Sequence, residues 1–530
     1  MFEMLSTPMI VGLFVLWFCF LFISYKGQPK GLWTLALANT GERFGYYTML
    51  AVFVLFLGDN FGFDSVWASE TFSTFLFFVY LLPLFGGMLA DKFGYSKMVV
   101  IGITIMFLGY LLLSVPLGGA TPALVAMCAG LLLVSLGTGL FKGNLQVMVG
   151  DLYNAPEYKD KRDSGFSLFY MAINVGALFA PTAAIAVMDW AQESLQYSKA
   201  DSYHFAFAVA CVSVIASMLV YFLGYKTFAH VAGSTKKAVS AKNESAKVQE
   251  PVVEETDTKE RIVCLCLVFA VVIFFWMAFH QNGLTLTWFA DEYTATTSTG
   301  IESMMFDVRN LLACIFIVYG IFGLFQTKGF AKVLAGIMVL LSAVFLYNMV
   351  PGAGVETKLS APIFQQFNAC FVVMLTPISI ALFGWLGSKG KEPKAPVKIG
   401  MGMLVAAAAY LMLAFSCVGL PAADPVNHTH LADLSPNLLV NTYLILTFAE
   451  LLLSPIGISF VTKVAPTKYK GMMMGGWFVA TAIGNYLVSI GGNLWGDMPL
   501  WGVWSVFVAV CAIAAIFMFA MMKKLEDATK

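Results

Sequence analysis

A stripe of five polar residues interrupts an apolar stretch near the start of the chain. It consists of Asn39, Glu42, Arg43, Tyr46 and Tyr47. Their spacing of i, i+3, i+4, i+7 and i+8 places all five on one face of a helix. A charged side chain at bilayer depth costs about 2.5–3.5 kcal/mol on insertion scales, so it tends to face a bundle interior or a watery cavity. One interpretation is a Glu–Arg pair that only locks helices together. The two tyrosines favour the other interpretation, the wall of a substrate cavity.

Three further polar residues stand alone within apolar runs. Lys142 lies beside Gly139 and Gly143, a small-xxx-small pair that lets another helix approach closely. Lys142 either extends to the headgroups or faces the interior. Asn174 is either an inter-helix hydrogen bond or a ligand for a substrate amide. Glu450 is a lone carboxylate that needs a partner or a proton.

The elements that must position these residues are membrane-spanning helices. The 530 residues are 59% hydrophobic and only 12% charged, whereas soluble domains carry about 25% charged residues. The net charge is zero and the basic residues fall in loops, so a nucleic-acid partner is not implied. The nine cysteines show no paired spacing, and we interpret them as small buried hydrophobes rather than disulfides or metal ligands. The composition predicts an all-α polytopic membrane protein.

Hydropathy predicts about fifteen spans. They cover residues 8–25, 32–57, 68–90, 97–116, 121–145, 165–188, 203–225, 262–287, 307–326, 331–350, 361–388, 397–418, 437–462, 471–492 and 499–522. The first run follows Glu3 rather than basic residues and lacks a small-x-small cleavage site, so a retained helix is favoured over a signal peptide.

Loop charges predict the orientation. Alternate loops are basic and include Lys26, Lys97, Arg162, Lys237, Lys332, Lys394, Lys463 and Lys523. The opposite loops hold little more than Lys199 and Lys358. The positive-inside rule then places the N-terminus outside and the C-terminus in the cytoplasm, which requires an odd number of spans.

One sizeable polar stretch divides the chain after the seventh span. Residues 230–261 are rich in Lys and Glu and have no apolar period, which predicts a flexible cytoplasmic linker. Two six-helix halves then remain if the first span and the pair at 307–350 are accessory, an arrangement that suggests the major facilitator architecture. The expected organisation is an extra N-terminal helix at 1–30, a six-helix bundle at 31–228, a linker at 229–261, and a second bundle at 262–530 with an inserted hairpin at 307–350. We expect that hairpin to be peripheral and lipid-facing.

Ordered motifs give a more specific indication. The loop Gly87-Met-Leu-Ala-Asp91-Lys-Phe-Gly94-Tyr-Ser-Lys97 resembles the gating-loop motif of the major facilitator superfamily. Further motifs are Glu42-Arg43-Phe-x-Tyr46-Tyr47, Gly-x-Gly-x-x-Lys142-x-Asn144, Phe169-Tyr170-x-x-Ile-Asn174, Phe275-Trp276-x-x-x-His280-Gln281, Phe364-Gln365-x-x-Asn368, Glu450-x-x-x-Ser454-Pro455 and Gly475-Gly476-Trp477.

This set resembles the proton-dependent oligopeptide transporter family over about residues 31–525. The resemblance implies proton-driven import of di- and tripeptides across the bacterial cytoplasmic membrane by alternating access. Asp91, Gly94 and Lys97 would then have a conformational role. The chain departs from the family at two acids implicated in proton coupling, where it has Asn39 and His280. Asn39 cannot titrate, and His280 becomes cationic when protonated. We therefore expect coupling to involve Glu42 and His280, although His280 could instead stay neutral and hydrogen-bonded.

A cavity for a peptide zwitterion needs a cationic end, an anionic end and tolerant walls. We expect Arg43 and Lys142 to bind the carboxylate, Glu450 the amino terminus, and Asn174 and Asn368 the peptide backbone. The predicted substrate-binding set is Arg43, Tyr46, Tyr47, Tyr80, Lys142, Asn174, Trp276, Gln281, Asn368, Glu450, Ser454 and Trp477.

The sequence leaves other functions to consider. One is a related facilitator or symporter for another small zwitterion or anion, with altered or absent proton coupling. A membrane receptor or scaffold has no need of three costly intramembrane charges. No nucleophile–base pair or metal-ligand array stands out, so we expect neither an enzyme nor a cofactor or metal. The His428-Thr-His430 loop, near Asp424 and Asp433, is expected to be solvated. The expected partners are peptides, protons and the bilayer, and the expected state is a monomer.

Overall fold

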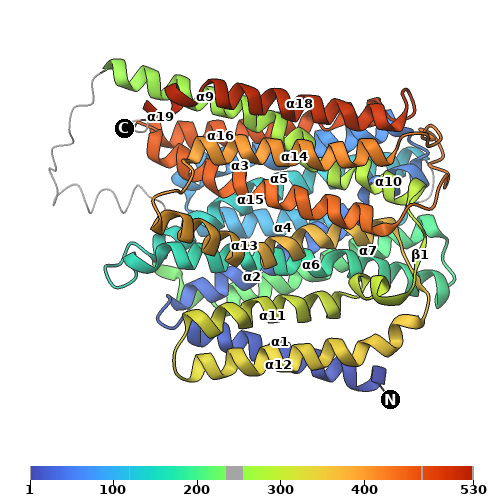
Figure 1. Ribbon diagram of the computed structural model, residues 1–530, viewed down its shortest axis with the longest axis horizontal. Helices are drawn as coiled ribbons and strands as arrows, with labels where there is room; N and C mark the ends of the chain where they lie inside the picture. The colour runs from blue at the N-terminus through green and yellow to red at the C-terminus, as the bar shows by residue number, and fades with distance from the viewer. Residues whose placement is uncertain (1, 118–119, 234–254, 467–468, 528–530) are drawn as a thin grey trace.

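The computed structural model describes residues 2–117, 120–233, 255–466 and 469–527 (Figure 1). Fifteen helices in these ranges are long and apolar enough to cross a membrane, which confirms the predicted fold class and span number. The helices lie with their long axes roughly aligned, and the two termini are at opposite ends of the bundle. Most of the predicted linker, residues 234–254, lies outside the described ranges.

The first part of the chain is helical throughout. Its helices are α1 (Phe2–Ser24), α2 (Lys30–Phe61), α3 (Ser65–Phe93), α4 (Tyr95–Ser114), α5 (Ala120–Leu152), α6 (Arg162–Glu193) and α7 (Lys199–Leu223). Short 3-10 helices are η1 (Lys159–Lys161), η2 (Tyr225–Thr227) and η3 (Ala229–Val231). We call α2–α7 the first half.

The second part contains more interruptions. Its α-helices are α9 (Glu255–Phe279), α10 (Thr285–Tyr293), α11 (Val308–Gln326), α12 (Phe330–Met349), α13 (Gln366–Ser388), α14 (Ala395–Ser416), α15 (Pro436–Val464), α16 (Lys470–Tyr486), α17 (Ser489–Asn493), α18 (Leu500–Ala520) and α19 (Met522–Asp527). The 3-10 helices are η4 (His280–Gly283), η5 (Gly300–Phe306), η6 (Val350–Gly354) and η7 (Ala361–Gln365). Strands β1 (Thr297–Ser298) and β2 (Thr357–Lys358) pair antiparallel, with Thr297 opposite Lys358. We call α9–α10 and α13–α18 the second half.

Local chemistry fixes the helix ends. The Asp64 carboxylate caps α3 by accepting a 2.9 Å hydrogen bond from the Trp67 amide. Gly94 joins α3 to α4 with φ of 102°, a conformation that L side chains rarely adopt. Because lipid offers the backbone no hydrogen-bond partners, the spans complete their hydrogen bonds internally as helices.

Two spans of the second half are broken. The 3-10 turn η4 separates α9 from α10, and a short step at Leu487 and Val488 separates α16 from α17. These two broken spans pack against each other through α9 and α16. Discontinuous helices in transporters often expose polar groups at a substrate site, and the break at η4 carries the polar residues His280 and Asn282.

Contacts between the halves run along two seams. On one seam, α3 packs against α16 and α17, and on the other, α6 packs against α13. Hydrogen bonds cross both seams, including the Ser69 hydroxyl to Asn493 Oδ1 at 3.4 Å and the Thr182 hydroxyl to Gln366 Oε1 at 3.1 Å. The central space between the halves is therefore bounded on two sides by close helix contacts.

The accessory helices form one three-helix unit at an edge of the bundle (Figure 1). Helix α1 packs on α11 and α12, although these lie far apart in the sequence. Trp17, only 2% exposed, contacts Phe316 and Tyr319 with ring centroids 5.5 and 6.0 Å apart. Helix α11 also packs on α13 and α6. The prediction that the whole hairpin is peripheral is wrong for α11, because its buried side is held between α1, α12 and the core.

Candidate functional site

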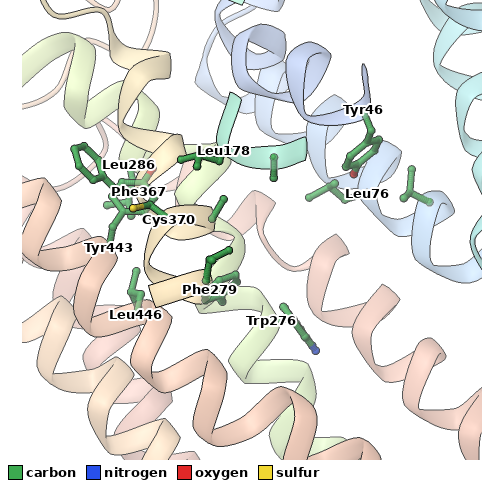
Figure 2. Close-up of a cluster of buried hydrophobic side chains, with 14 of the residues drawn as sticks. Tyr46, Leu76, Leu178, Trp276, Phe279, Leu286, Phe367, Cys370, Tyr443 and Leu446 are labelled. Atoms are coloured by element: carbon green, nitrogen blue, oxygen red, sulfur yellow. The ribbon is translucent and has the colours of Figure 1, made fainter. Parts of the chain in front are cut away.

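A central cavity of about 240 Å³ lies between the two halves. Residues from α2, α3, α5 and α6 form one wall, and residues from α9, α13, α15 and α16 form the other. In Figure 2, the labelled residues Tyr46 and Leu76 belong to the first half, and Trp276 and Phe279 belong to the second. Those four residues line the cavity, so its walls combine buried aromatic surface with polar groups.

The polar stripe on α2 faces this cavity. Asn39, Arg43, Tyr46 and Tyr47 line it, whereas Glu42 is fully buried behind them. The Arg43 guanidinium donates two hydrogen bonds to the Glu42 carboxylate, from Nε at 2.6 Å and from Nη2 at 2.7 Å. Arg43 Cζ also lies 4.8 Å from the centroid of the Tyr46 ring. The ion pair thus orients Arg43 while leaving the guanidinium on the cavity wall.

Lys142 enters the cavity from α5. Its Nζ lies 4.1 Å from the centroid of the Tyr80 ring, within range of a cation–π interaction. No carboxylate lies within ion-pair distance of Lys142 in the ranges given above. The structure therefore places this ammonium on the cavity wall rather than among headgroups.

Glu450 enters from α15 in the opposite half and is 8% exposed. Its carboxylate accepts a 3.1 Å hydrogen bond from Asn368 Nδ2, which also donates to the Thr447 hydroxyl at 3.0 Å. The Tyr170 side chain is also within hydrogen-bonding reach of Glu450. No cation forms an ion pair with Glu450 in the described chain. An anionic group and two cationic groups thus face one cavity from different halves.

His280 lies at the helix break η4 on the cavity wall. Its Nδ1 is hydrogen-bonded to Asn485 Oδ1, and its ring stacks on Trp276 at 4.9 Å and 19°. The ring centroid of Tyr80 lies 5.8 Å away. Tyr80 therefore contacts both Lys142 and His280. None of these contacts of His280 is with Arg43 or Glu42.

Two indoles and two small polar groups complete the wall: Trp276, Trp477, Asn174 and Ser454. Trp276 is 8% exposed, and its Nε1 has no hydrogen-bond partner among the described residues. Asn174 donates to the Tyr170 carbonyl at 3.0 Å within α6, so this bond is neither an inter-helix bond nor a bond to substrate. The side chains of Trp276 and Asn174 can still present a polar atom to a bound molecule.

Gln281 corrects one prediction. It is fully buried and is not among the lining residues. Its amide donates to the carbonyls of Met277 at 3.1 Å and Val488 at 2.9 Å, and it accepts from the Thr285 hydroxyl at 2.7 Å. Gln281 ties the break in α9–α10 to the break in α16–α17, because one side chain satisfies backbone groups from both. Its role here is to support the cavity wall.

The gating-loop motif lies away from the cavity, at the α3–α4 turn. Asp91 accepts a 2.6 Å hydrogen bond from the Tyr95 hydroxyl across Gly94, and Lys97 is exposed at the start of α4. This geometry fixes the angle between two helices and offers no substrate contact.

The structure adds lining residues that the sequence did not single out. They include Tyr170, Gln365, Asn282, Gln146 and Thr481. Gln365 donates to the Ala51 carbonyl at 3.2 Å across the halves and to the Thr287 hydroxyl at 3.1 Å. Tyr170 and Gln365 stood within the motifs already quoted, so their polar character inside apolar spans was the available signal.

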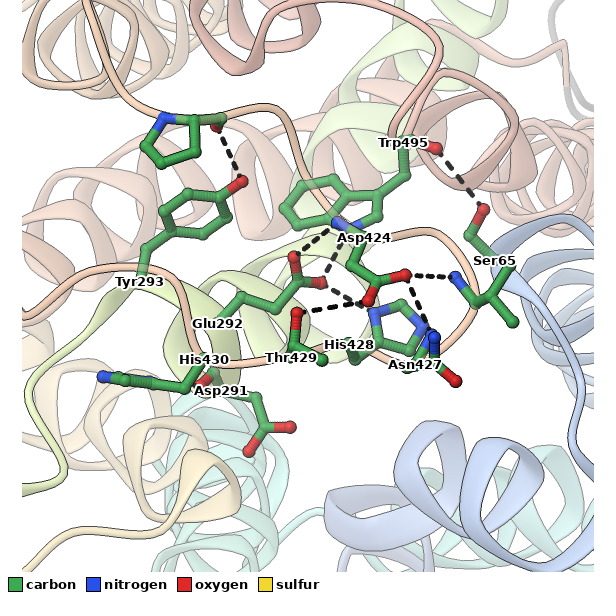
Figure 3. A network of polar contacts seen from close by, with 12 residues as sticks. Ser65, Asp291, Glu292, Tyr293, Asp424, Asn427, His428, Thr429, His430 and Trp495 are labelled. Carbon is green, nitrogen blue, oxygen red and sulfur yellow. Dashed lines mark hydrogen bonds and ion pairs between the residues drawn. The ribbon is translucent and has the colours of Figure 1, made fainter.

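A second polar network lies in the loop between α14 and α15 (Figure 3). His428 has φ of 48°, is 11% exposed in its side chain, and stacks on Trp288 at 4.7 Å. Its Nδ1 lies 2.7 Å from Oε1 of the fully buried Glu292, which also accepts from Trp495 Nε1 at 2.8 Å. The prediction of a solvated loop is wrong for His428, because partners distant in sequence enclose it.

The rest of that loop is more exposed. Backbone hydrogen bonds, chiefly from the Asn427 amide, lower the pKa of Asp424. The carbonyl of Asp291 holds a nitrogen of His430 at 3.0 Å and raises the pKa of this imidazole. The loop also meets the first half, since the Ser65 amide donates to the Pro425 carbonyl at 2.7 Å. The halves are therefore joined at the face where α1 begins.

Comparisons with known proteins give matches along most of the chain. The POT family profile, PTR2, matches residues 96–248 and 338–498. The peptide transporter YePEPT of Yersinia enterocolitica is 27% identical over 96% of this chain and 97% of its own. The uncharacterized transporter YclF of Bacillus subtilis is 29% identical over 90% of each chain. A crystal structure of a peptide transporter POT in complex with sulfate superposes with a TM-score of 0.70 at 23% identity, covering 95% of this chain and 96% of that one.

Proposed function

The chain belongs to the POT family, and on that premise we propose that it imports di- and tripeptides by alternating access. The observation that carries the proposal is the pair formed by Lys142 and Glu450. The two charges face one cavity from opposite halves, and neither has an ionic partner within the described ranges. The peptide-transporter name of the Yersinia relative supports the same substrate class.

A zwitterionic peptide would provide an ionic partner for both Lys142 and Glu450. Its carboxylate would pair with Lys142 and with the free edge of Arg43, and its amino terminus with Glu450. Buried charges are costly when unpaired, so each end of the peptide would relieve one such cost. A substrate held by both halves favours the state in which they are close together, and only such differential affinity can shift the equilibrium between states.

The remaining walls would bind the peptide without strong side-chain selection. Asn174 and Asn368 would hydrogen-bond the peptide backbone, and the unpaired Trp276 Nε1 would donate a further hydrogen bond. Aromatic walls accept varied apolar groups. They would be formed by Tyr46, Tyr47, Tyr80 and Trp477, with Ser454 beside them.

Proton coupling is proposed to act through the Glu42–Arg43 pair. Glu42 occupies two donors of Arg43, so protonating Glu42 would weaken the pair and free Arg43 for the peptide carboxylate. His280 would act as a second group, because its charge would be felt by Lys142, which contacts the same Tyr80 ring.

The proposed location is the bacterial cytoplasmic membrane, with the N-terminus outside and the C-terminus in the cytoplasm. Exposed basic side chains at the face where α18 ends, such as Lys92, Lys97 and Lys523, support this orientation. Residues 31–228 and 262–530 would be the two moving bundles, joined by the linker at 229–261. A single chain supplies both ends of the cavity, so we propose that a monomer transports.

A second candidate is a facilitator or symporter for another small zwitterion or anion, with altered or absent proton coupling. It is favoured by Asn39, which lines the cavity without a titratable group, and by the Asn485 hydrogen bond that holds His280. Uptake that does not respond to a pH gradient would support this candidate.

Uptake of labelled Ala-Ala into proteoliposomes, with and without an inward proton gradient, tests the proposal. We expect gradient-driven accumulation in the wild type and at least a tenfold loss of uptake in Glu450→Gln, since the substitution removes the anionic end. Glu193→Gln, at the exposed end of α6, is the matched control and should transport normally. Absence of Ala-Ala uptake by the folded wild type would contradict the proposal.

A further inference from the structure

A second cavity of about 340 Å³ adjoins the central one. It lies between α6 and α13 on the side of the core and α1 and α11 on the outer side. We call it the side chamber. Tyr170 lines both spaces, so a single side chain stands where they meet.

The side chamber has amphipathic and uncharged walls. Polar groups come from Ser24, Tyr25, Tyr319, Gln326 and Thr376, with apolar side chains between them, and no Lys, Arg, Asp or Glu is among the lining residues. Ser24 and Gln326 are exposed at the ends of α1 and α11, whereas Tyr25, Tyr319 and Thr376 are partly buried. This lining suits a chamber that holds water or a polar solute. Four of the five, Ser24, Tyr25, Tyr319 and Gln326, come from the accessory helices or the turn that follows α1.

The position of Tyr170 indicates which end of a bound substrate would lie next to the side chamber. Its side chain is within hydrogen-bonding reach of Glu450, which is proposed to hold the peptide amino terminus. The first residue of a bound peptide would therefore have its side chain beside Tyr170. The opposite end of the peptide, near Arg43 and Lys142, would have no access to this chamber.

Building on the proposed function, we propose that the side chamber receives the side chain of the first residue of a peptide substrate, and that it selects large uncharged side chains. Aromatic rings with a polar atom suit walls of mixed hydroxyl and apolar groups. A charged side chain would lose its hydration without gaining a counterion. Tyr170 would act as the specificity-determining residue between the two spaces.

Order-reversed dipeptides test this inference. Inhibition of labelled Ala-Ala uptake by Trp-Ala and Tyr-Ala would be compared with inhibition by Ala-Trp and Ala-Tyr. We expect the peptides with the aromatic residue first to inhibit about tenfold more strongly, a range typical of an added apolar contact. Lys-Ala should inhibit less than Trp-Ala.

A substitution that fills the side chamber provides a second test of the inference. Thr376 lines the side chamber but not the central cavity, and its hydroxyl bonds only within α13, to Val372 O at 2.6 Å. Thr376→Phe should abolish the advantage of Trp-Ala over Ala-Trp while leaving the KM for Ala-Ala unchanged. Ile378→Phe, at an exposed position of the same helix, is the matched control and should keep the advantage.

The outcomes separate this inference from the proposed function. No Ala-Ala uptake by the wild type would contradict the proposed function itself. Normal Ala-Ala uptake with equal inhibition by Trp-Ala and Ala-Trp would overturn the side-chamber proposal alone. An equal loss for all peptides in Thr376→Phe, with the order preference retained, would also overturn it. The wild-type comparison decides the question even if the variant fails to fold.

Discussion

Glu42 and Arg43 are sequence neighbours whose side chains meet in a bidentate pair beside the cavity. Glu42 is completely buried, and Arg43 is 3% exposed. Such a pair is strongly destabilised when one partner loses its charge, because the other is left uncompensated. The proposed peptide carboxylate could then replace Glu42 as the partner of Arg43. This exchange would couple a proton to a substrate at two adjacent residues.

Replacing Glu42 with Gln tests that exchange. The variant mimics the protonated state permanently, so proton-gradient-driven accumulation of Ala-Ala should be lost while counterflow exchange continues. Both are measured in proteoliposomes preloaded or not with unlabelled peptide. Glu302→Gln, outside the cavity, serves as the control. Full gradient-driven accumulation in Glu42→Gln would contradict the coupling hypothesis.

His430 gives a prediction of pH-dependent stability. The Asp291 carbonyl raises its pKa in the folded protein, so its stabilising contribution is present below the ordinary value near 6.5 and is lost as pH rises through the raised pKa. The group is largely exposed to solvent screening, so the effect is under about 1 kcal/mol. His430→Asn should lower the melting temperature more at pH 5.5 than at pH 8.5, by fluorescence in detergent. An equal shift at both values would rule this contribution out.

At the residue scale, most of the residues that the sequence predicted to bind substrate do line the central cavity. Arg43, Lys142 and Glu450 were recognisable because a charged side chain inside an apolar span is costly and is therefore rare unless it has a function. Gln281 and His428 were not placed correctly, since their environment depends on Val488 and on Trp288, which lie far away in the chain. A single sequence reveals which residues are polar but not which distant backbone groups will satisfy them.

Among the helices, α3 and α5 make one of the tightest contacts. An added Cβ at Gly139 would lie 2.6 Å from Leu82 Cβ and 3.0 Å from its carbonyl carbon. At Gly143, one turn further, the nearest atom would be Pro83 Cβ at 3.8 Å. The two glycines of the small-xxx-small pair therefore differ: Gly139 is required by the packing, and Gly143 is not.

Alanine at each glycine distinguishes these roles. Gly139→Ala should destabilise the protein by about 1–3 kcal/mol, because the backbone of α3 must move. Gly143→Ala should be nearly neutral, since its methyl group meets only ordinary contacts. Thermal unfolding in detergent measures both. Equal melting temperatures for the two variants would show that the α3–α5 contact tolerates a wider separation.

The sequence predicted the positions of the helices along the chain well, but it did not predict which helices pack against one another. Hydropathy alone gave fifteen spans, because a bilayer demands about twenty apolar residues for each. The same apolar periodicity does not reveal which helix packs on which. The association of α1 with α11 and α12 therefore could not be read from the chain, although each helix was predicted.

For the whole molecule, hydrogen bonds between the halves include several at the face where α1 begins. Ser65 bonds to Pro425, and Ser69 bonds to Asn493. Alternating access requires those bonds to break when the cavity opens to that side. The loop network around Glu292 holds the second-half surface against which α3 rests.

A crosslink across this contact tests the motion. In Ser69→Cys/Asn493→Cys, oxidation should form a disulfide and stop Ala-Ala uptake, and reduction should restore it. Ser69→Cys and Asn493→Cys, each made alone, are the controls and should transport under both conditions. Unchanged uptake by a fully crosslinked double variant would mean that these halves do not separate here during transport.

The three-helix unit of α1, α11 and α12 also has a consequence for biosynthesis. Helix α1 is made before its partners, which begin at Val308. At translation rates of about 5–20 residues per second, roughly 15 to 60 s separate them. During that interval Trp17 faces lipid or a chaperone instead of Phe316. Maturation of this protein therefore includes a late lateral docking event in the bilayer, after α11 and α12 have left the insertion machinery.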